Sequence, residues 1–157
     1  YIPAGGDEPD IDKNPKFNHK LKFIAEMTEH FSQQQPFRSI LVGDLNIAPL
    51  AEDVWSTRQL RNTVSHTAIE RENLLALVEQ GGWTDSVRAH FGPKEVLFSW
   101  WSYRARDWVA SNRGRRLDHI WVSRDLASKV EAVTIESAMR GAEKPSDHVP
   151  LTITLQP

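Results

Sequence analysis

An amphipathic helix followed by a short apolar run constrains the fold of this chain most strongly. Apolar side chains recur at helical spacing through residues 17–34, at Phe17, Leu21, Ile24, Met27 and Phe31. This spacing places them on one face of a helix, and that face must be covered by another layer of structure. The apolar run that follows ends in Gly43, and we interpret residues 38–43 as a buried strand. The pattern therefore predicts a helix packed on a sheet.

The rest of the chain alternates short predicted elements with polar loops. Thr67 and Glu70 form a capping box that begins a second helix, and Gly81-Gly82 ends it. We predict loops at 1–16, 47–66, 104–116 and 145–148, a short helix at 125–130, and strands at 96–103, 117–122, 131–136 and 149–155. Several of these strands follow one another closely. The prediction is therefore a mixed α/β fold with hairpin-like neighbours rather than strict βαβ alternation.

Composition limits the classes of function. The chain has 157 residues, enough for one domain with a core, and a net charge of −2 that gives no global basic field for nucleic acid. It has no cysteine, which excludes disulfides and thiolate metal sites. No apolar run approaches about 18 residues, and no signal peptide is visible. We expect a cytoplasmic protein outside the membrane. Because the chain begins with Tyr1 rather than Met, we interpret it as a segment of a longer protein.

Asp44 and Asn46 follow the first predicted strand at alternate positions. Residues i and i+2 of a strand share a face, so both head groups enter one cavity if the strand continues past Gly43. There the carboxylate could take a proton from water or bind a metal, and the carboxamide could hold a phosphate oxygen or the same water. The alternative is a polar turn, which the two residues alone favour.

A second group of polar residues precedes the last strand. Asp147 and His148 are adjacent there, and Asp118 begins the predicted strand 117–122. The Asp–His pair could hold a metal and place an imidazole on a phosphate, while Asp118 behind His148 would fix its tautomer and favour its protonated form. Taken alone, these residues are also consistent with a turn aspartate beside a surface histidine, and with a simple strand-end acid.

Basic and aromatic residues are concentrated near the middle of the chain. Residues 112–116, Asn-Arg-Gly-Arg-Arg, form a basic turn that suits a phosphate backbone, with a solvated charge run as the alternative. Trp100 and Trp101 are adjacent in a predicted strand, so their side chains point to opposite faces. We expect one of them in the core and the other free to stack on a base or deoxyribose, or to wedge a helix.

Four segments, taken in order with Tyr1, carry a family resemblance: GDLNIAP at 43–49, FSWWSYR at 98–104, NRGRRLD at 112–118 and KPSDHVP at 144–150. Together they resemble exonuclease III, the bacterial branch of the abasic-site endonucleases in the endonuclease/exonuclease/phosphatase superfamily. The resemblance extends over residues 1–157. It implies that the chain is the C-terminal half of a four-layer α/β/β/α sandwich with mixed, largely antiparallel sheets, whose N-terminal half is absent.

The resemblance also implies catalytic roles. Asp44 would orient or deprotonate the attacking water, and Asn46 would hold that water or the scissile phosphate. His148, paired with Asp118, would donate to a non-bridging phosphate oxygen. Tyr1 would contact the phosphate. The implied reaction is hydrolysis of the phosphodiester 5′ to an abasic site, together with trimming of 3′ ends in duplex DNA.

The implied cofactor is Mg²⁺, or Mn²⁺, acting as a Lewis acid with Asp147 at or near the ion. Trp100 would line a pocket for the deoxyribose that lacks its base. The residues expected to bind duplex DNA are Trp100, Arg104, Asn112, Arg113 and Arg115.

The chain departs from the family pattern because the first half of the fold, which carries the main metal-binding glutamate, does not precede Tyr1. An apolar sheet face left open by this absence should not stay exposed. We therefore expect the missing N-terminal half or a swapped dimer partner to cover it, and we expect the isolated chain to be inactive.

Two alternatives to this function remain open. One is a non-catalytic DNA-binding or assembly fragment. The other is a phosphoesterase of the same superfamily acting on a phospholipid or inositol phosphate, against which the aromatic and basic loop argues.

Overall fold

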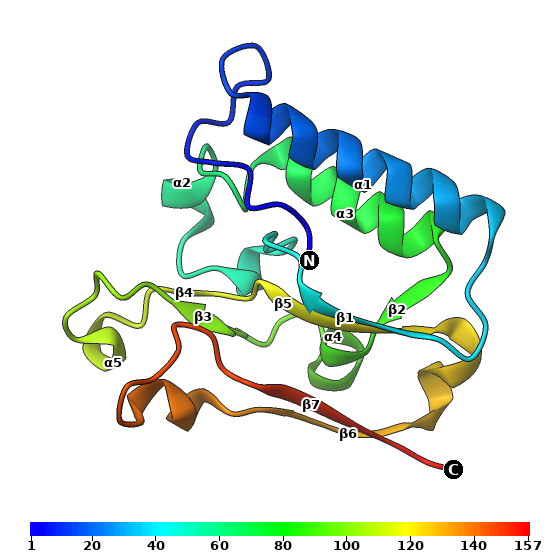
Figure 1. The fold of residues 1–157 in the computed structure, drawn as a ribbon. Helices are drawn as coiled ribbons and strands as arrows, with labels where there is room; N and C mark the ends of the chain where they lie inside the picture. Colours follow the sequence, from blue (N-terminus) through cyan, green and yellow to red (C-terminus); the bar gives the residue numbers. More distant parts are fainter.

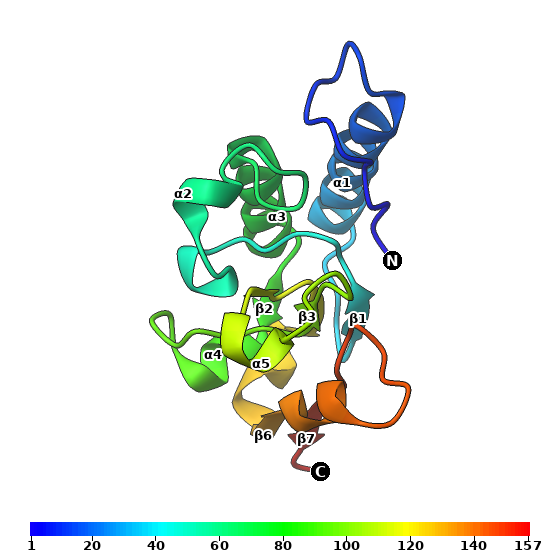
Figure 2. The same cartoon turned by 90° about the vertical axis from the view of Figure 1, so that its left-hand side faces the viewer.

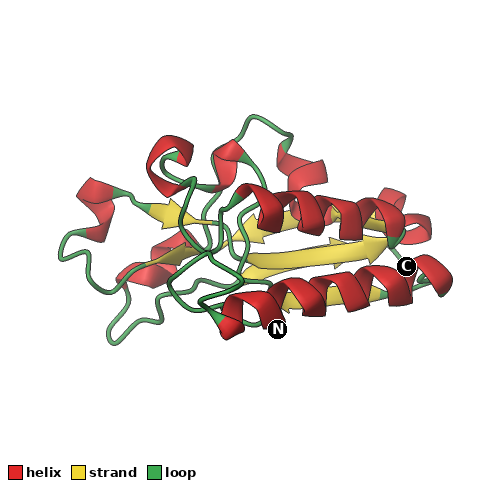
Figure 3. Ribbon diagram, turned by 90° about the horizontal axis from the view of Figure 1, so that it is seen from above, coloured by secondary structure: helices red, strands yellow, loops and turns green.

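Two long helices lie side by side over a small antiparallel sheet in the computed structural model, which describes residues 1–157. The helices are α1 (Pro15–Gln33) and α3 (Ala68–Gln80). The sheet has the order β1 (Ile40–Asp44), β5 (Asp118–Ser123) and β2 (Trp83–Asp85). Figure 1 shows both helices above this sheet, and Figure 3 shows the packing from above. None of the helices is long and apolar enough to span a membrane.

Two smaller strand pairs complete the fold. β3 (Trp100–Trp101) pairs with β4 (Gly114–Arg115), and β6 (Val130–Ile135) pairs with β7 (Leu151–Leu155). Figure 2 shows the order of the layers from the side, with the helices at the top and β6–β7 at the bottom. Every strand pair is antiparallel. The predicted mixed α/β fold with antiparallel sheets is therefore confirmed.

Local sequence signals explain why the two long helices begin where they do. The Asn14 side chain accepts hydrogen bonds from the first backbone N–H groups of α1, and Pro15 occupies its first turn. Thr67 and Glu70 form the predicted capping box of α3. Both helices bury their apolar faces against the sheet in one cluster, which contains Ile2, Ile24, Leu45, Ile47, Leu74, Leu77, Trp83 and Trp121. Both helix predictions are confirmed.

A strand does form within the segment predicted at 38–43, but the prediction that it is buried is wrong. β1 lies at the edge of its sheet, and its side chains alternate between two environments. Leu41 packs against the helix-covered core, whereas Ile40 is 46% exposed and Val42 is 62% exposed. The face of β1 that carries Ile40 and Val42 is therefore an uncovered apolar surface.

Several short elements were not predicted correctly. The predicted strand 96–103 is reduced to Trp100–Trp101, and β2 and α4 (Ser86–Phe91) had no predicted counterpart. The segments predicted as loops contain the one-turn helices α2 (Thr57–Leu60) and α5 (Trp108–Ser111) and the strand β4. Elements of this length show no measurable periodicity, so their sequence patterns do not distinguish them from loops. The predicted short helix 125–130 is a 3₁₀ helix, Arg124–Lys129, and two further 3₁₀ helices lie at Ala51–Asp53 and Ser137–Gly141.

Arg116 lies in the core, although its sequence places it in the predicted phosphate-binding turn. Its guanidinium is fully buried and donates to Asp53 through Nε and Nη2, at 2.7 and 3.0 Å. Its Nη1 donates to Asp85 at 2.8 Å. Burial of Asp85 opposes its ionisation, but the charge of Arg116 outweighs this effect and holds the Asp85 pKa well below its usual range. Arg116 therefore links Asp53 to Asp85 within the core. Its guanidinium is not accessible to DNA, contrary to the prediction for this turn.

We expect Arg116→Met to lower the free energy of unfolding by about 3–5 kcal/mol, because Asp85 then lies buried without its cation. Urea denaturation followed by circular dichroism measures the change. Arg58 is exposed, so Arg58→Met is the matched control and should change stability by less than about 0.5 kcal/mol. Equal effects of the two substitutions would contradict a structural role for the buried guanidinium.

Candidate active site

The register between β1 and β5 places Asp44 directly opposite Asp118. Two like charges at paired positions destabilise an antiparallel ladder unless a cation compensates them. His148 supplies this compensation from a distant part of the chain. Its Nδ1 lies 2.8 Å from Asp118 Oδ2, and its Nε2 lies 3.9 Å from Asp44 Oδ2. The structure thus brings Asp44 together with the pair of Asp118 and His148 that the sequence suggested.

Backbone pairing with β3 holds His148 in this position. Trp100 forms a β-bridge with His148, and the N–H of Trp101 donates to the Asp147 carbonyl at 2.9 Å. The N–H of Val149 donates to the Ser99 carbonyl at 2.8 Å. These bonds extend β3 by a short neighbouring segment. His148 is therefore fixed by main-chain hydrogen bonds on both sides.

Ser99 orients Asp118, and the sequence reasoning missed it. Its buried hydroxyl donates to Asp118 Oδ2 at 2.7 Å and accepts from the N–H groups of Leu117 and Asp118, both at 3.0 Å. The signal available in the sequence was weak: a single serine that precedes two tryptophans in a predicted strand. The hydroxyl fixes the carboxylate that in turn holds the imidazole of His148.

Asp44 and Asn46 do lie together, but strand alternation is not the reason. β1 ends at Asp44, and Asn46 has a φ of +53°, in the left-handed region. The Asn46 N–H donates to Asp44 Oδ1 at 2.9 Å, and its carboxamide donates to Asp44 Oδ2 at 3.0 Å. This is a turn closed by the aspartate side chain. The alternative of a polar turn was correct in its geometry, and the turn itself brings the two groups into contact.

The surroundings raise the pKa values of His148 and Asp44. The hydrogen bond to Asp118 raises the pKa of His148 above its ordinary value against an opposing effect of burial, and the charges of Asp118, Asp44 and Asp147 add to the rise. Burial raises the pKa of Asp44, and the nearby charge of Asp118 acts in the same direction. His148 is thus favoured in its protonated, donor form. Asp44 is a stronger base than an exposed aspartate.

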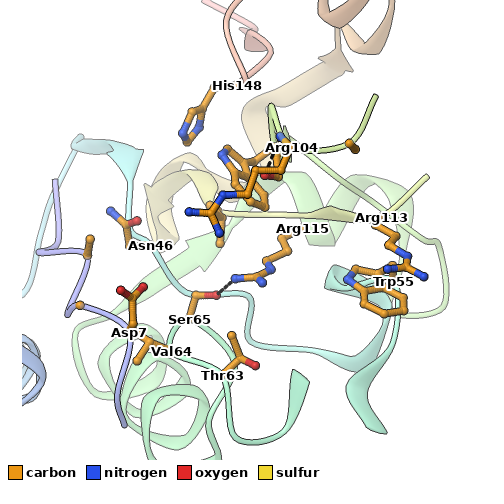
Figure 4. A pocket seen from close by; sticks show the side chains of 16 residues that line it. Asp7, Asn46, Trp55, Thr63, Val64, Ser65, Arg104, Arg113, Arg115 and His148 are labelled. Carbon is orange, nitrogen blue, oxygen red and sulfur yellow. Dashed lines mark hydrogen bonds between the residues drawn. The ribbon is translucent and has the colours of Figure 1, made fainter. Parts of the chain in front are cut away.

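A cavity of about 690 Å³ adjoins this cluster. Figure 4 shows Asn46 and His148 at one side of it, Arg115 and Ser65 below them, and Arg113 beside Trp55 farther away. Trp100 also lines the cavity, whereas Trp101 is buried in the core. The two tryptophans therefore divide between core and site as expected from their opposite faces.

The predicted DNA-binding residues occupy different environments. Arg104 is exposed and lines the cavity. The guanidinium of Arg113 lies 4.6 Å from the ring centre of Trp55, and that of Arg115 lies 5.3 Å from the ring centre of Trp100. The carboxamide oxygen of Asn112 accepts from the Trp101 indole at 3.1 Å, a contact that supports the loop.

Tyr1 and Asp147 lie at the edges of the site. The side chain of Tyr1 is 75% exposed, and the next residue is anchored by the Ile2 N–H, which donates to the Asp44 carbonyl at 3.1 Å. Asp147 Oδ2 accepts from the indole N–H of Trp100 at 3.0 Å. Asp147 is thus engaged with the cavity wall and stands outside the cluster of Asp44, Asp118 and His148. Its predicted metal role stays a prediction.

A buried ion pair between Lys20 and Glu70 contacts the backbone of the site, and it was not predicted from the sequence. Lys20 Nζ lies 2.6 Å from Glu70 Oε1, and both side chains are fully buried. The ammonium also donates to the carbonyls of Asn46 at 2.8 Å and Ala4 at 3.2 Å. The signal in the sequence is a lysine three residues after Phe17 and four before Ile24, within the apolar face of a helix. The ion pair ties α1 and α3 to the turn that carries Asn46.

The cluster fits a divalent cation only in part. Ligand atoms of Asp44, Asp118 and His148 lie within 4.8 Å of one another. Carboxylate oxygens suit Mg²⁺ or Mn²⁺, but the imidazole is bonded to Asp118 and favoured in its protonated form, which repels a cation. An octahedral ion here would need further oxygen donors. The three residues therefore offer only some of the ligands that a divalent ion would need.

Comparison with known proteins identifies the family. Residues 21–148 match the model of the endonuclease/exonuclease/phosphatase family. This chain belongs to that family. Exodeoxyribonuclease III from Haemophilus influenzae is 32% identical over 158 residues, which cover 96% of this chain and 58% of that protein. The resemblance to the exonuclease III and abasic-site endonuclease branch is confirmed.

Two solved structures share the fold closely. An AP endonuclease from Archaeoglobus fulgidus has a TM-score of 0.88 at 30% identity, over 99% of this chain and 59% of that one. A 3′ phosphatase from Neisseria, bound to a product DNA hairpin, has a TM-score of 0.88 at 29% identity over the same shares. The chain thus spans little more than half the length of these family members.

We expect Asp118→Asn to lower the pKa of His148, because it removes the anion that raises this pKa and leaves the opposing effect of burial. Titration of the His148 imidazole by NMR in buffer containing EDTA measures the shift. Asp12→Asn, at an exposed position, is the matched control and should leave the His148 pKa unchanged. An unchanged His148 pKa in Asp118→Asn would show that the carboxylate does not hold the imidazole.

Proposed function

We propose that the protein containing this chain is a divalent-metal-dependent DNA-repair nuclease. It hydrolyses phosphodiesters 5′ to abasic sites and trims the 3′ ends of duplex DNA. One observation carries the proposal: His148 lies between two opposed carboxylates at the edge of a cavity lined by arginine and tryptophan. The names of the relatives, an exodeoxyribonuclease III, an AP endonuclease and a 3′ phosphatase bound to DNA, support the same class of substrate.

The proposed mechanism uses each group in the protonation state that the structure favours. Asp44, with its raised pKa, takes a proton from the attacking water, and the carboxamide of Asn46 holds that water or the phosphate. Protonated His148 donates from Nε2 to a non-bridging phosphate oxygen and offsets the charge that develops there. Asp118 holds the imidazole by its Nδ1. The carboxylates of Asp44 and Asp118 would be among the ligands of a bound Mg²⁺ or Mn²⁺, which would supply Lewis-acid stabilisation of the phosphate.

DNA is the proposed partner, and the cavity provides its contacts. Arg104, Arg113 and Arg115 offer positive charge to the backbone, and Trp100 offers an aromatic wall to the abasic sugar. The exposed side chain of Tyr1 reaches the phosphate in this proposal, and the carboxamide nitrogen of Asn112 reaches the backbone.

We also propose that the chain forms the C-terminal half of a larger domain, with an N-terminal half or a swapped partner covering the apolar face of β1. Two observations support this proposal. The exposed side chains of Ile40 and Val42 form an open apolar surface beside the site. The chain covers only 58% of the Haemophilus influenzae relative. The metal ligands that Asp44 and Asp118 do not supply would come from that other half.

The proposal predicts Mg²⁺-dependent incision of an abasic duplex by the complete protein. Asp44→Asn and His148→Gln should each lower kcat by about 10²–10⁴-fold, the range for loss of a general base or acid. Cleavage of a fluorescent oligonucleotide duplex measures the rate, with Asp12→Asn as the matched control. The chain of 157 residues alone should show negligible incision. Strong incision by this chain that depends on Asp44 would contradict its proposed dependence on a second half.

The two arginine–tryptophan pairs favour a second candidate, a DNA-binding module without catalysis. If phosphate contacts dominate, log affinity falls linearly with log salt concentration. Arg113→Ala/Arg115→Ala should then reduce the salt slope by about 2, because two phosphate contacts are lost. Gel shift with an intact duplex at several salt concentrations measures the slope. Absence of binding at low salt would exclude this candidate.

A further inference from the structure

Basic side chains, rather than backbone pairing, hold the carbonyl groups of the turn that carries Asn46. The carbonyls of residues 46–49 accept no hydrogen bond from a backbone N–H. Each of these four consecutive carbonyls instead accepts from a different basic side chain: Lys20 at Asn46 (2.8 Å), His119 at Ile47 (2.9 Å), His66 at Ala48 (2.7 Å) and Arg71 at Pro49 (2.9 Å). We call these four donors the basic clamp.

The donors of the basic clamp come from four parts of the chain. Lys20 lies in α1, His119 in β5, Arg71 in α3, and His66 in the segment that precedes α3. Arg71 is half-buried, and the other three side chains are buried. A carbonyl can only accept, so each imidazole nitrogen that faces one must carry its proton. Because solvent does not reach the buried donors, each of these carbonyls depends on its own partner.

Asn46 is the residue of this turn that most needs such restraint. Its φ of +53° lies in the left-handed region, where a residue other than glycine persists only when surrounding contacts hold it. Figure 4 shows its carboxamide at the cavity. The same carboxamide donates to Asp44 Oδ2 at 3.0 Å and to the Ile2 carbonyl at 3.0 Å. A rotation of the Asn46 backbone would therefore move the carboxamide away from Asp44.

Lys20 is the member of the basic clamp that binds the Asn46 carbonyl itself. Its Nζ also donates to the Ala4 carbonyl at 3.2 Å and lies 2.6 Å from Glu70 Oε1. These three partners match the three protons of an ammonium group. Glu70 is fixed in turn, because it accepts from the N–H and the hydroxyl of Thr67 at 3.1 and 2.6 Å. The ammonium is thus held in one place, with no donor left over.

We propose that Lys20 is a positioning residue that sets the place of the Asn46 carboxamide beside Asp44 and thereby controls kcat. This inference rests on the proposed nuclease function and deepens it. The Lys20 side chain is fully buried, so it acts through the Asn46 backbone and touches neither DNA nor the attacking water. A misplacement of about 1 Å at a catalytic group can cost about 10²-fold in rate. The proposed DNA contacts do not involve Lys20, so KM should be retained.

The test compares Glu70→Gln with Lys20→Met/Glu70→Gln in the complete protein. Lys20→Met alone would leave the charge of Glu70 buried without its cation, and this could prevent folding. Both variants lack that charge, and the double variant alone lacks the donor to Asn46. On an abasic duplex with Mg²⁺, the double variant should have a kcat about 10- to 100-fold below that of Glu70→Gln, with the same KM.

Hydrogen–deuterium exchange of the same proteins, followed by mass spectrometry, reports on the turn without any reaction. Peptides that cover residues 43–49 should exchange faster in Lys20→Met/Glu70→Gln than in Glu70→Gln, because the Asn46 carbonyl has lost its donor. Peptides from β6 and β7 should exchange equally in both variants. A selective change of this kind separates positioning of the turn from a general loss of stability.

Arg88→Met is the matched control for loss of a basic side chain. Arg88 also donates to two backbone carbonyls, those of Gly92 at 2.8 Å and Glu95 at 2.7 Å, and it pairs with Asp53. It donates to no carbonyl of residues 46–49. Arg88→Met should lower the melting temperature measured by circular dichroism and leave both kcat and exchange at residues 43–49 unchanged.

Two results would overturn the proposal. The first is a double variant that keeps the kcat and the exchange of Glu70→Gln. The second is a double variant in which exchange rises throughout the protein and kcat falls only with the folded fraction, since Lys20 would then have a structural role alone. If the wild-type protein does not incise the duplex, the proposed function fails instead. The exchange comparison then decides whether Lys20 positions Asn46.

Discussion

The pairing of Asp44 with Asp118 across β1 and β5 is the constraint on which the site depends. Two carboxylates opposite each other in a partly buried ladder repel, so the local structure requires a cation between them. His148 meets that requirement, and its own position depends on backbone bonds to β3. A register shift of one residue would send both carboxylates to the other face of the sheet. The strand register therefore sets both the geometry and the protonation states of the cluster.

Two adjacent arginines near the site, Arg115 and Arg116, lie in different electrostatic environments. Arg116 is neutralised in the core by Asp53 and Asp85. Arg115, the adjacent residue in the chain, lines the cavity without a carboxylate partner. Adjacent residues of an extended segment point to opposite sides, so one basic turn supplies a buried cation and a cation that lines the cavity. The difference between them lies in their partners rather than in their residue type.

The sequence predicted the parts of the structure that local patterns encode. The helix periodicity through α1, the capping box at Thr67 and the motifs around Asp44 and His148 all depend on residues close in the chain. What could not be predicted depends on distant partners. The burial of Arg116 requires Asp53 and Asp85, and that of Lys20 requires Glu70, 50 residues away in the sequence. No periodicity reveals which acid a basic residue will meet.

The same long-range contacts decide what kind of metal site this chain can contribute. The shortest interaction of His148 is with Asp118, which also accepts from Ser99, and both oxygens of Asp44 accept from Asn46. The lone pairs that face a divalent ion are therefore few, and the imidazolium opposes its charge. A divalent ion beside these carboxylates must obtain most of its oxygen ligands elsewhere, from phosphate, water and further acids. The cluster is consequently better arranged to move protons and hold a phosphate than to hold a metal alone.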